Sequence, residues 1–192
     1  DIPIIFFSIN NQELAKNAAK NPKCSGYYSP SYLKDTLSLA TSLQMGADTI
    51  MVLYDNTYWG NQAKEEFFSL QRSFSSYRFA GLNFSQMKKE DFLEAIEKLD
   101  EKSIVLYIST TLDEDGNYYP GNQAMKMVLS RANVPVYSYV MLDNVKGFLA
   151  GRAPDIKQMA KDASLLMLDV LSGKKDVEKT AEEEDSPGKL TV

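Results

Sequence analysis

Four short apolar runs, each followed by polar residues, constrain the fold of this chain more than any other feature of its sequence. The runs cover residues 4–7, 49–54, 103–108 and 134–139, and stretches with helical periodicity separate them. Continuous apolar runs, unlike alternating ones, are typical of strands that are buried on both faces of a parallel sheet. The sequence therefore predicts an α/β fold with a doubly wound, mainly parallel sheet covered by helices.

The helices expected between these strands follow from apolar residues spaced three or four apart. Ser31 is a plausible cap for the second helix, which ends before Gly46. A shorter strand is expected at residues 77–84 and another at 189–192, while residues 25–30 should be extended because Pro30 disfavours helix at the preceding residue. The predicted helices cover residues 12–20, 33–43, 61–74, 85–99 or 88–99, 122–132 and 153–171.

Polar loops follow the predicted strands, and in parallel sheets ligands bind outside the carboxyl ends of the strands. Asp55, Asn56 and Thr57 lie between a strand and a helix, where they can either cap the helix amides or receive a ligand group. Tyr58 and the single tryptophan, Trp59, follow directly. Aromatic side chains there can stack on a small organic ligand or simply fill core space. Both interpretations stay open.

Hydroxyl groups follow the third run. Ser109, Thr110 and Thr111 can grip a carboxylate or an amide, or they can form a hydrogen-bonded turn. Residues 111–116 resemble the start of a calcium loop, but the calcium template needs an acidic first ligand and a glutamate at the twelfth position. Here Thr111 and Asn122 occupy those positions, so an acidic turn is the better interpretation.

Composition excludes several classes of function. The 192 residues include 21 Lys and Arg against 26 Asp and Glu, and this net charge of −5 supplies no basic footprint for nucleic acid. The chain has no histidine, so it lacks the commonest general base and the commonest metal ligand. Cys24 is the single cysteine and is expected to behave as a small hydrophobe. No glycine-rich phosphate loop is present. We therefore expect no enzyme activity, no cofactor and no bound metal.

No stretch of the sequence approaches the roughly twenty apolar residues that are needed to span a bilayer. Asp1, Ile2 and Pro3 lead directly into a predicted strand, without an initiating methionine. This start indicates a processed chain or an excised fragment of a longer one.

Taken in order, the segments resemble extracytoplasmic ligand-binding domains related to the substrate-binding proteins of ABC transporters, which have the type I periplasmic-binding fold. The resemblance is closer still to the sensor domains of membrane histidine kinases and diguanylate cyclases. It covers nearly the whole chain and rests on the order and spacing of short motifs. These motifs are residues 2–6 with Asn10, 25–27, 52–57 with Gly60, 103–106 with Asp113 and Gly116, 135–137, Gly147 with Gly151, and 170–174.

The resemblance implies two α/β lobes joined by crossing segments, with a small ligand held between them. Residues 1–29 would be a remnant of the first lobe with a crossing segment, and residues 30–143 the second lobe. Residues 144–186 would return with a long helix toward the first lobe, and residues 187–192 would form a final strand. Most of the first lobe would then be missing, and the apolar surface left exposed could favour a homodimer.

By this resemblance we expect an extracytoplasmic sensor domain for a small molecule, anchored to the membrane through segments outside this chain. The alternative is the substrate-binding protein of an ABC importer for an amino acid or a similar small polar solute. A cytosolic flavodoxin-like response module or an α/β enzyme is a third class, which the absence of histidine disfavours. The expected ligand contacts are Ser8 and Asn10 in the first lobe, and Asp55, Thr57, Tyr58, Thr110, Thr111 and Tyr139 in the second.

Overall fold

The computed structural model describes residues 2–140, 145–177, 182–183 and 189–191. The chain divides into two compact units. The first unit comprises Asp1–Tyr32 and Pro154–Lys189, and the second comprises Leu33–Ala153 and Leu190–Val192. The boundaries predicted at residues 143–144 and 186–187 lie outside the described residues.

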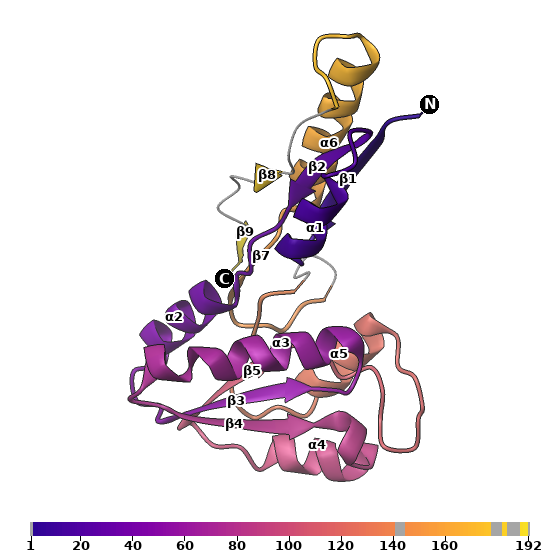
Figure 1. Cartoon of the computed structure of the whole chain (residues 1–192). Coiled ribbons are helices and arrows are strands. Elements are labelled where there is room, and N and C mark those ends of the chain that lie inside the picture. The colour runs from indigo at the N-terminus through magenta and orange to yellow at the C-terminus, as the bar shows by residue number, and fades with distance from the viewer. Residues whose placement is uncertain (1, 141–144, 178–181, 184–188, 192) are drawn as a thin grey trace. The chain divides into compact units, whose positions relative to one another are not determined.

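The second unit is built on a four-stranded sheet in the order β4-β3-β5-β6, and every pair of neighbouring strands is parallel (Figure 1). This sheet confirms the predicted α/β fold with parallel strands. The strands are β3 (Thr49–Tyr54), β4 (Arg78–Asn83), β5 (Ser103–Tyr107) and β6 (Val136–Ser138). The helices are α2 (Leu33–Leu43), α3 (Tyr58–Ser69), α4 (Lys89–Glu97) and α5 (Gly121–Leu129), with short 3-10 helices at Leu70–Phe74 and Phe84–Gln86.

Strands β3 and β5 are buried on both faces, as their apolar runs predict. On one face, Leu53 of β3 and Val105 of β5 join an apolar core with Phe92 and Ile96 of α4 and Val128 of α5. On the other face, α2 contacts β5 and β6 while α3 contacts β3. The central strands are therefore fixed from both sides, and the loops at their ends begin from a rigid base.

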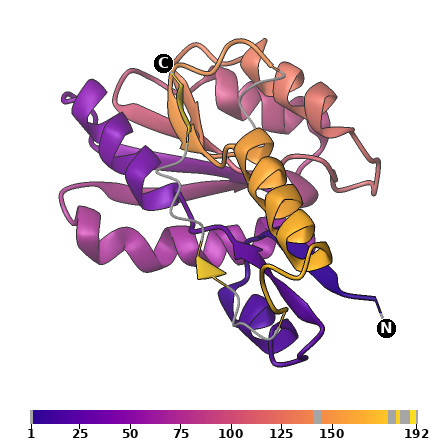
Figure 2. The same ribbon diagram turned by 90° about the horizontal axis from the view of Figure 1, so that it is seen from above.

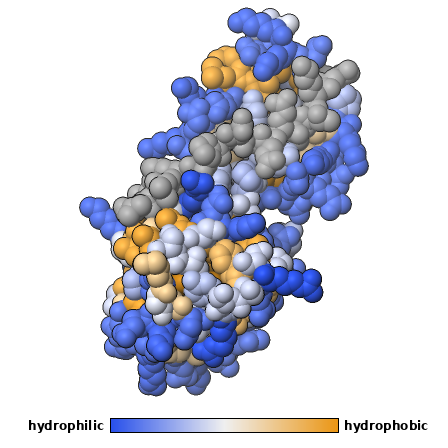
Figure 3. Space-filling view, turned by 90° about the vertical axis from the view of Figure 1, so that its left-hand side faces the viewer, coloured by the Kyte–Doolittle hydropathy of each residue, from blue (hydrophilic) through white to orange (hydrophobic). Residues whose placement is uncertain are grey.

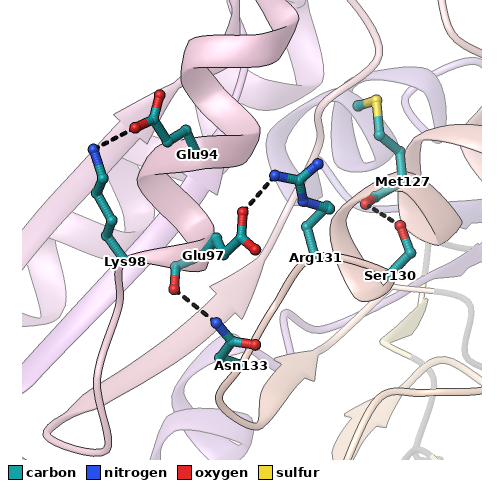
Figure 4. A network of polar contacts seen from close by, with 7 residues as sticks. All are labelled: Glu94, Glu97, Lys98, Met127, Ser130, Arg131 and Asn133. Atoms are coloured by element: carbon teal, nitrogen blue, oxygen red, sulfur yellow. Dashed lines mark hydrogen bonds and ion pairs between the residues drawn. The ribbon is translucent and has the colours of Figure 1, made fainter.

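Polar contacts connect the end of α4 to the residues that follow α5 (Figure 4). Glu97 pairs with Arg131, and the side-chain amide of Asn133 donates to the Glu97 carbonyl at 2.8 Å. Lys98 pairs with Glu94 one turn earlier on α4. Exposed ion pairs contribute little to stability, so these contacts fix the position of the helix ends more than they stabilise the core.

The first unit contains a three-stranded sheet in the order β1-β2-β8, again with parallel pairing. Its elements are β1 (Ile4–Ile9), α1 (Gln12–Ala18), β2 (Cys24–Tyr28), α6 (Ile156–Leu171) and β8 (Glu182–Glu183). Helix α6 lies along β1 and β2 (Figure 2). Strand β2 falls in the segment that was predicted to be extended. A separate two-stranded sheet pairs β7 (Gly151–Ala153), which the sequence did not predict, with β9 (Lys189–Thr191).

Strand β1 departs from the predicted burial. The run at residues 4–7 was expected to be buried on both faces, yet Ile4 is 55% exposed and Phe7 is 40% exposed. This prediction was wrong because β1 is the edge strand of its small sheet. Apolar surface is visible among the polar side chains in Figure 3. Besides Ile4 and Phe7, the exposed apolar residues of the first unit include Ile2, Leu14, Ile156, Leu165, Leu168 and Leu171.

Two backbone features accompany the pairing of β1 with β2. Gly26 lies opposite Phe6 with φ at +152°, and a Cβ atom on Gly26 would come within 2.0 Å of the Phe6 carbonyl oxygen. The register then shifts between Phe6 and Ile9, and Ser8 has φ at +59°. Only a residue without a side chain allows the two strands to approach this closely at Gly26. Cys24, in the same strand, is buried with a free thiol.

Helix boundaries differ from the predictions where a cap decides them. Helix α3 begins at Tyr58 rather than at residue 61, because the side chain of Thr57 caps it. Helix α6 begins at Ile156 rather than at residue 153, because β7 extends to Ala153 and Asp155 provides the cap. Among the residues that the structure describes, no helix is long and apolar enough to cross a membrane.

Candidate functional site

The carboxyl ends of the second unit's strands meet at one edge of its sheet, because all four strands are parallel. Three segments leave from this edge: Asp55 to Thr57 with the first turn of α3 after β3, Ile108 to Thr111 after β5, and Tyr139 to Val140 after β6. Six of the eight predicted site residues therefore lie along this edge. They are Asp55, Thr57, Tyr58, Thr110, Thr111 and Tyr139.

The Asp55 carboxylate joins two of these loops. Its Oδ1 accepts hydrogen bonds from the backbone N–H of Thr57 at 3.1 Å and from the Thr57 hydroxyl at 2.5 Å. Its Oδ2 accepts three more, from the Ser109 hydroxyl at 2.7 Å, the Thr111 N–H at 2.7 Å and the Thr111 hydroxyl at 2.9 Å. Asp55 itself is fully buried. We call this arrangement of Asp55, Thr57, Ser109 and Thr111 the Asp55 hub.

The start of α3 is built around the same carboxylate. The Thr57 hydroxyl accepts from the Gly60 N–H at 3.1 Å, so Thr57 caps the helix while its own proton goes to Asp55. A Cβ atom on Gly60 would lie 2.4 Å from both the carbonyl oxygen and Oδ1 of Asp55. The glycine therefore lets the helix start approach the hub. Capping is the observed role of this loop, one of the two roles that the sequence left open.

The hydrogen bonds determine the charge state of Asp55. Burial raises the pKa of its carboxyl group, but the donors from Thr57, Thr111 and Ser109 together outweigh burial and leave the pKa below its ordinary value. The carboxylate is therefore ionised at neutral pH. A carboxylate only accepts hydrogen bonds, and this one has five donors directed at it.

The residues that follow β4 join the same edge. The Asn83 side-chain amide donates to Oδ1 of Asn56 at 2.9 Å, and the Asn56 N–H donates to the Ser85 hydroxyl at 3.0 Å. That hydroxyl donates in turn to the Leu112 carbonyl at 2.7 Å. The sequence analysis missed Asn83 and Ser85. A polar residue at the carboxyl end of the strand predicted at residues 77–84 was the available signal.

Aromatic side chains lie beside the hub. The rings of Trp59 and Tyr139 are 6.2 Å apart between centroids, and Tyr58, which precedes Trp59 in the first turn of α3, is 73% exposed. Tyr139 is buried, and its hydroxyl has no hydrogen-bond partner in the part of the chain that the structure describes. Burial raises the pKa of Tyr139 far above its ordinary value. The edge thus combines a polar hub with aromatic surface, a combination typical of small-molecule sites.

Thr110 faces inward. It is fully buried, and its hydroxyl is 3.5 Å from the hydroxyl of Tyr107, a separation at the outer limit of a hydrogen bond. Ser8 and Asn10 belong to the first unit, where Ser8 is partly buried and Asn10 exposed. The predictions that these three residues contact a ligand stay predictions.

The segment that resembles a calcium loop forms a turn instead. Asp113 is buried and accepts from the Asn117 N–H at 2.8 Å, the Asn117 side chain at 3.0 Å and the Tyr119 hydroxyl at 3.0 Å. Its carboxylate therefore closes the turn between β5 and α5. Among the described residues, no group of three or more acidic or cysteine side chains is placed to hold a metal ion.

Comparisons with known proteins identify the fold. No protein-family model matches the chain, and no curated protein matches it by sequence. Solved structures do match. A conserved domain protein from Vibrio cholerae is 17% identical with a TM-score of 0.68. An ABC domain from Streptococcus pneumoniae, solved in complex with L-Trp, is 16% identical with a TM-score of 0.66. A ligand-free, open substrate binding protein with adhesive properties from Clostridium difficile is 16% identical with a TM-score of 0.69.

Each of these three matches covers 99% of this chain and 63% of the other chain. A LacI transcriptional regulator from Lactobacillus brevis matches at 14% identity, with a TM-score of 0.57, over 97% of this chain and 77% of its own. The chain thus has a fold of the type I periplasmic-binding-protein kind and spans about two thirds of the length of these relatives. At such low identity the likeness establishes the fold alone.

Proposed function

We propose that this chain is part of an extracytoplasmic small-molecule-binding protein of the kind that delivers solutes to an ABC importer. The observation that carries the proposal is the polar and aromatic edge of the second unit's sheet, on a fold that substrate-binding proteins share. The ligand would lie against the loops that follow β3, β5 and β6. Parallel α/β sheets bind ligands at this position.

The chemistry of the edge supports an amino acid or a similar small polar solute with an apolar or aromatic part. Asn56 and Tyr58 are exposed at the start of α3, where backbone amides attract carboxylates. The exposed ring of Tyr58 and the partly buried ring of Trp59 provide flat surface for an apolar part. One relative of the same fold was solved with L-Trp, an amino acid of this shape.

A thermal-shift screen of amino acids and related metabolites tests the proposal. A ligand present at 100 times its dissociation constant stabilises the folded state by about 2.7 kcal/mol, a readily measured shift. The hit is then titrated against Tyr58→Ala, whose side chain is 73% exposed and whose loss should leave the fold intact. Met45→Ala is the matched control, because Met45 is 86% exposed and lies before β3, at the opposite end of the strands.

We expect weaker binding in Tyr58→Ala and unchanged binding in Met45→Ala. If no small molecule stabilises the protein, the proposal fails, and interaction with another protein becomes the better hypothesis.

A sensor domain of a membrane histidine kinase or diguanylate cyclase is the second candidate, and the order of motifs in the sequence favours it. The named relatives favour the importer, because two of them are an ABC domain and a substrate binding protein. Sequencing the surrounding gene separates the two. A lipoprotein cysteine upstream supports the importer, whereas transmembrane segments with a kinase or cyclase domain support the sensor.

A further inference from the structure

We infer that Asp55 is a positioning residue: its carboxylate holds the loops after β3 and β5 in one arrangement, and it does this without touching the ligand. The inference rests on the proposed function, since it assigns the internal support of that same binding edge. Asp55 is fully buried, and within the described residues its carboxylate accepts five hydrogen bonds, from Thr57, Ser109 and Thr111. No accepting capacity is left for a ligand amine, because a carboxylate offers about four lone-pair sites.

The pattern of donors explains why the position requires a carboxylate. The hydroxyls of Thr57, Ser109 and Thr111 can rotate and so can accept a hydrogen bond as well as donate one. The backbone N–H groups of Thr57 and Thr111 can only donate, and they point at different oxygens of Asp55. The backbone N–H groups of the two loops therefore need both oxygens of Asp55 to act as acceptors simultaneously.

An asparagine cannot meet this requirement. Whichever way its amide is turned, the NH₂ group faces one of the two backbone N–H groups, and one loop loses its acceptor. Asp55→Asn is nearly the same size as the native residue, so it tests hydrogen-bond direction and charge rather than packing. Asp48→Asn is the matched control for charge, because Asp48 is exposed and lies next to the amino end of β3.

Trp59 reports on the hub directly. It is the single tryptophan, it lies two residues after Thr57, and its ring is partly buried beside Tyr139. Acrylamide quenching of its fluorescence measures how well the loop is ordered, and the measurement needs no ligand. Far-UV circular dichroism shows in parallel whether each variant is folded.

We expect Asp55→Asn to be folded, with Trp59 quenched at least twofold more efficiently than in the wild type. The affinity for the ligand found in the screen should fall about tenfold or more. Asp48→Asn should match the wild type in both measurements. Wild-type quenching in Asp55→Asn, or an equal change in Asp48→Asn, overturns the inference.

A second measurement on the unaltered protein covers the case in which Asp55→Asn does not fold. Hydrogen exchange at the Thr57 and Thr111 amides should be slow, because both are bonded to the buried carboxylate. Exchange at the rate of an unstructured chain overturns the inference. Fluorescence quenching and hydrogen exchange need no ligand, so they test the hub separately from the affinity measurement. An intact hub with no hit in the screen defeats the proposed function alone, and binding without an ordered hub defeats this inference alone.

Discussion

Replacing Gly60 with alanine should destabilise the second unit, because the added methyl group meets the Asp55 hub. The new Cβ atom would lie 2.4 Å from both the carbonyl oxygen and Oδ1 of Asp55, about 1 Å short of an ordinary contact at 3.4 Å. Neither atom can move freely. Oδ1 accepts two hydrogen bonds from Thr57, and the carbonyl belongs to the residue that directly follows β3.

Three contributions of opposite sign determine how far Gly60→Ala changes the free energy of unfolding. Overpacking at a rigid site costs about 1–3 kcal/mol. Loss of one hydrogen bond to a charged group costs about 1.5–3 kcal/mol more. The higher helix propensity of alanine offsets up to about 1 kcal/mol of this destabilisation. We therefore expect Gly60→Ala to lower the free energy of unfolding by about 1.5–6 kcal/mol.

Gly121→Ala provides the matched control. Gly121 also lies in the first turn of a helix, α5, but a Cβ atom there meets nothing within 4 Å. We expect it to stabilise the protein by about 0.5–1 kcal/mol. Urea unfolding followed by Trp59 fluorescence is the assay, because the single tryptophan belongs to the second unit and reports its unfolding. A Gly60→Ala protein as stable as the wild type, or a similar loss in Gly121→Ala, would refute the reasoning.

Three further predictions concern Gly26, Tyr137 and the charge of Asp55. Gly26→Ala should destabilise the first unit by more than about 3 kcal/mol, because its methyl group overlaps the Phe6 carbonyl. We expect faster proteolysis at β1, and a rate of proteolysis equal to that of the wild type contradicts this prediction. The buried hydroxyl of Tyr137 has no hydrogen-bond partner among the described residues, so Tyr137→Phe should stabilise the protein by up to about 1 kcal/mol in thermal unfolding. A loss of stability would contradict this prediction and mean that the hydroxyl has a partner. The pKa of Asp55 is lowered in the folded state, so the stability that its ionised form contributes is complete at neutral pH and is lost as the pH falls below about 4 and through the folded-state pKa. The difference in unfolding free energy between the wild type and Asp55→Asn should therefore shrink over that pH range. A difference that does not depend on pH contradicts this prediction.

The sequence predicted the central sheet well because apolar runs carry the signal. Strands β3 and β5 are buried on both faces, and their runs at residues 49–54 and 103–108 fit them to within one residue. The run at residues 4–7 has the same composition but lies in an exposed edge strand. Composition alone cannot tell an edge from a centre, because the neighbours that decide burial come from elsewhere in the chain.

The candidate site shows a similar division. Asp55 and Thr111 could be placed at the same edge of the sheet from their positions after parallel strands. The hub itself could not be predicted, since it depends on the direction of each donor across 56 residues of sequence. Thr57 had two open roles, and the structure shows its hydroxyl already engaged with Asp55 and Gly60. Local residues indicate where polar groups gather, but tertiary geometry decides which of them stay free.

If the ligand binds at the carboxyl ends of β3, β5 and β6, the backbone amides near those ends should respond to it most strongly. Chemical-shift mapping with the compound found in the screen measures this response. We expect the largest changes at Asn56 to Gly60 and at Ser109 to Leu112. A shallow pocket lies on α5, lined by Asn122, Lys126 and Ser130. Changes concentrated in that pocket or at the amino ends of the strands would show that the ligand binds elsewhere.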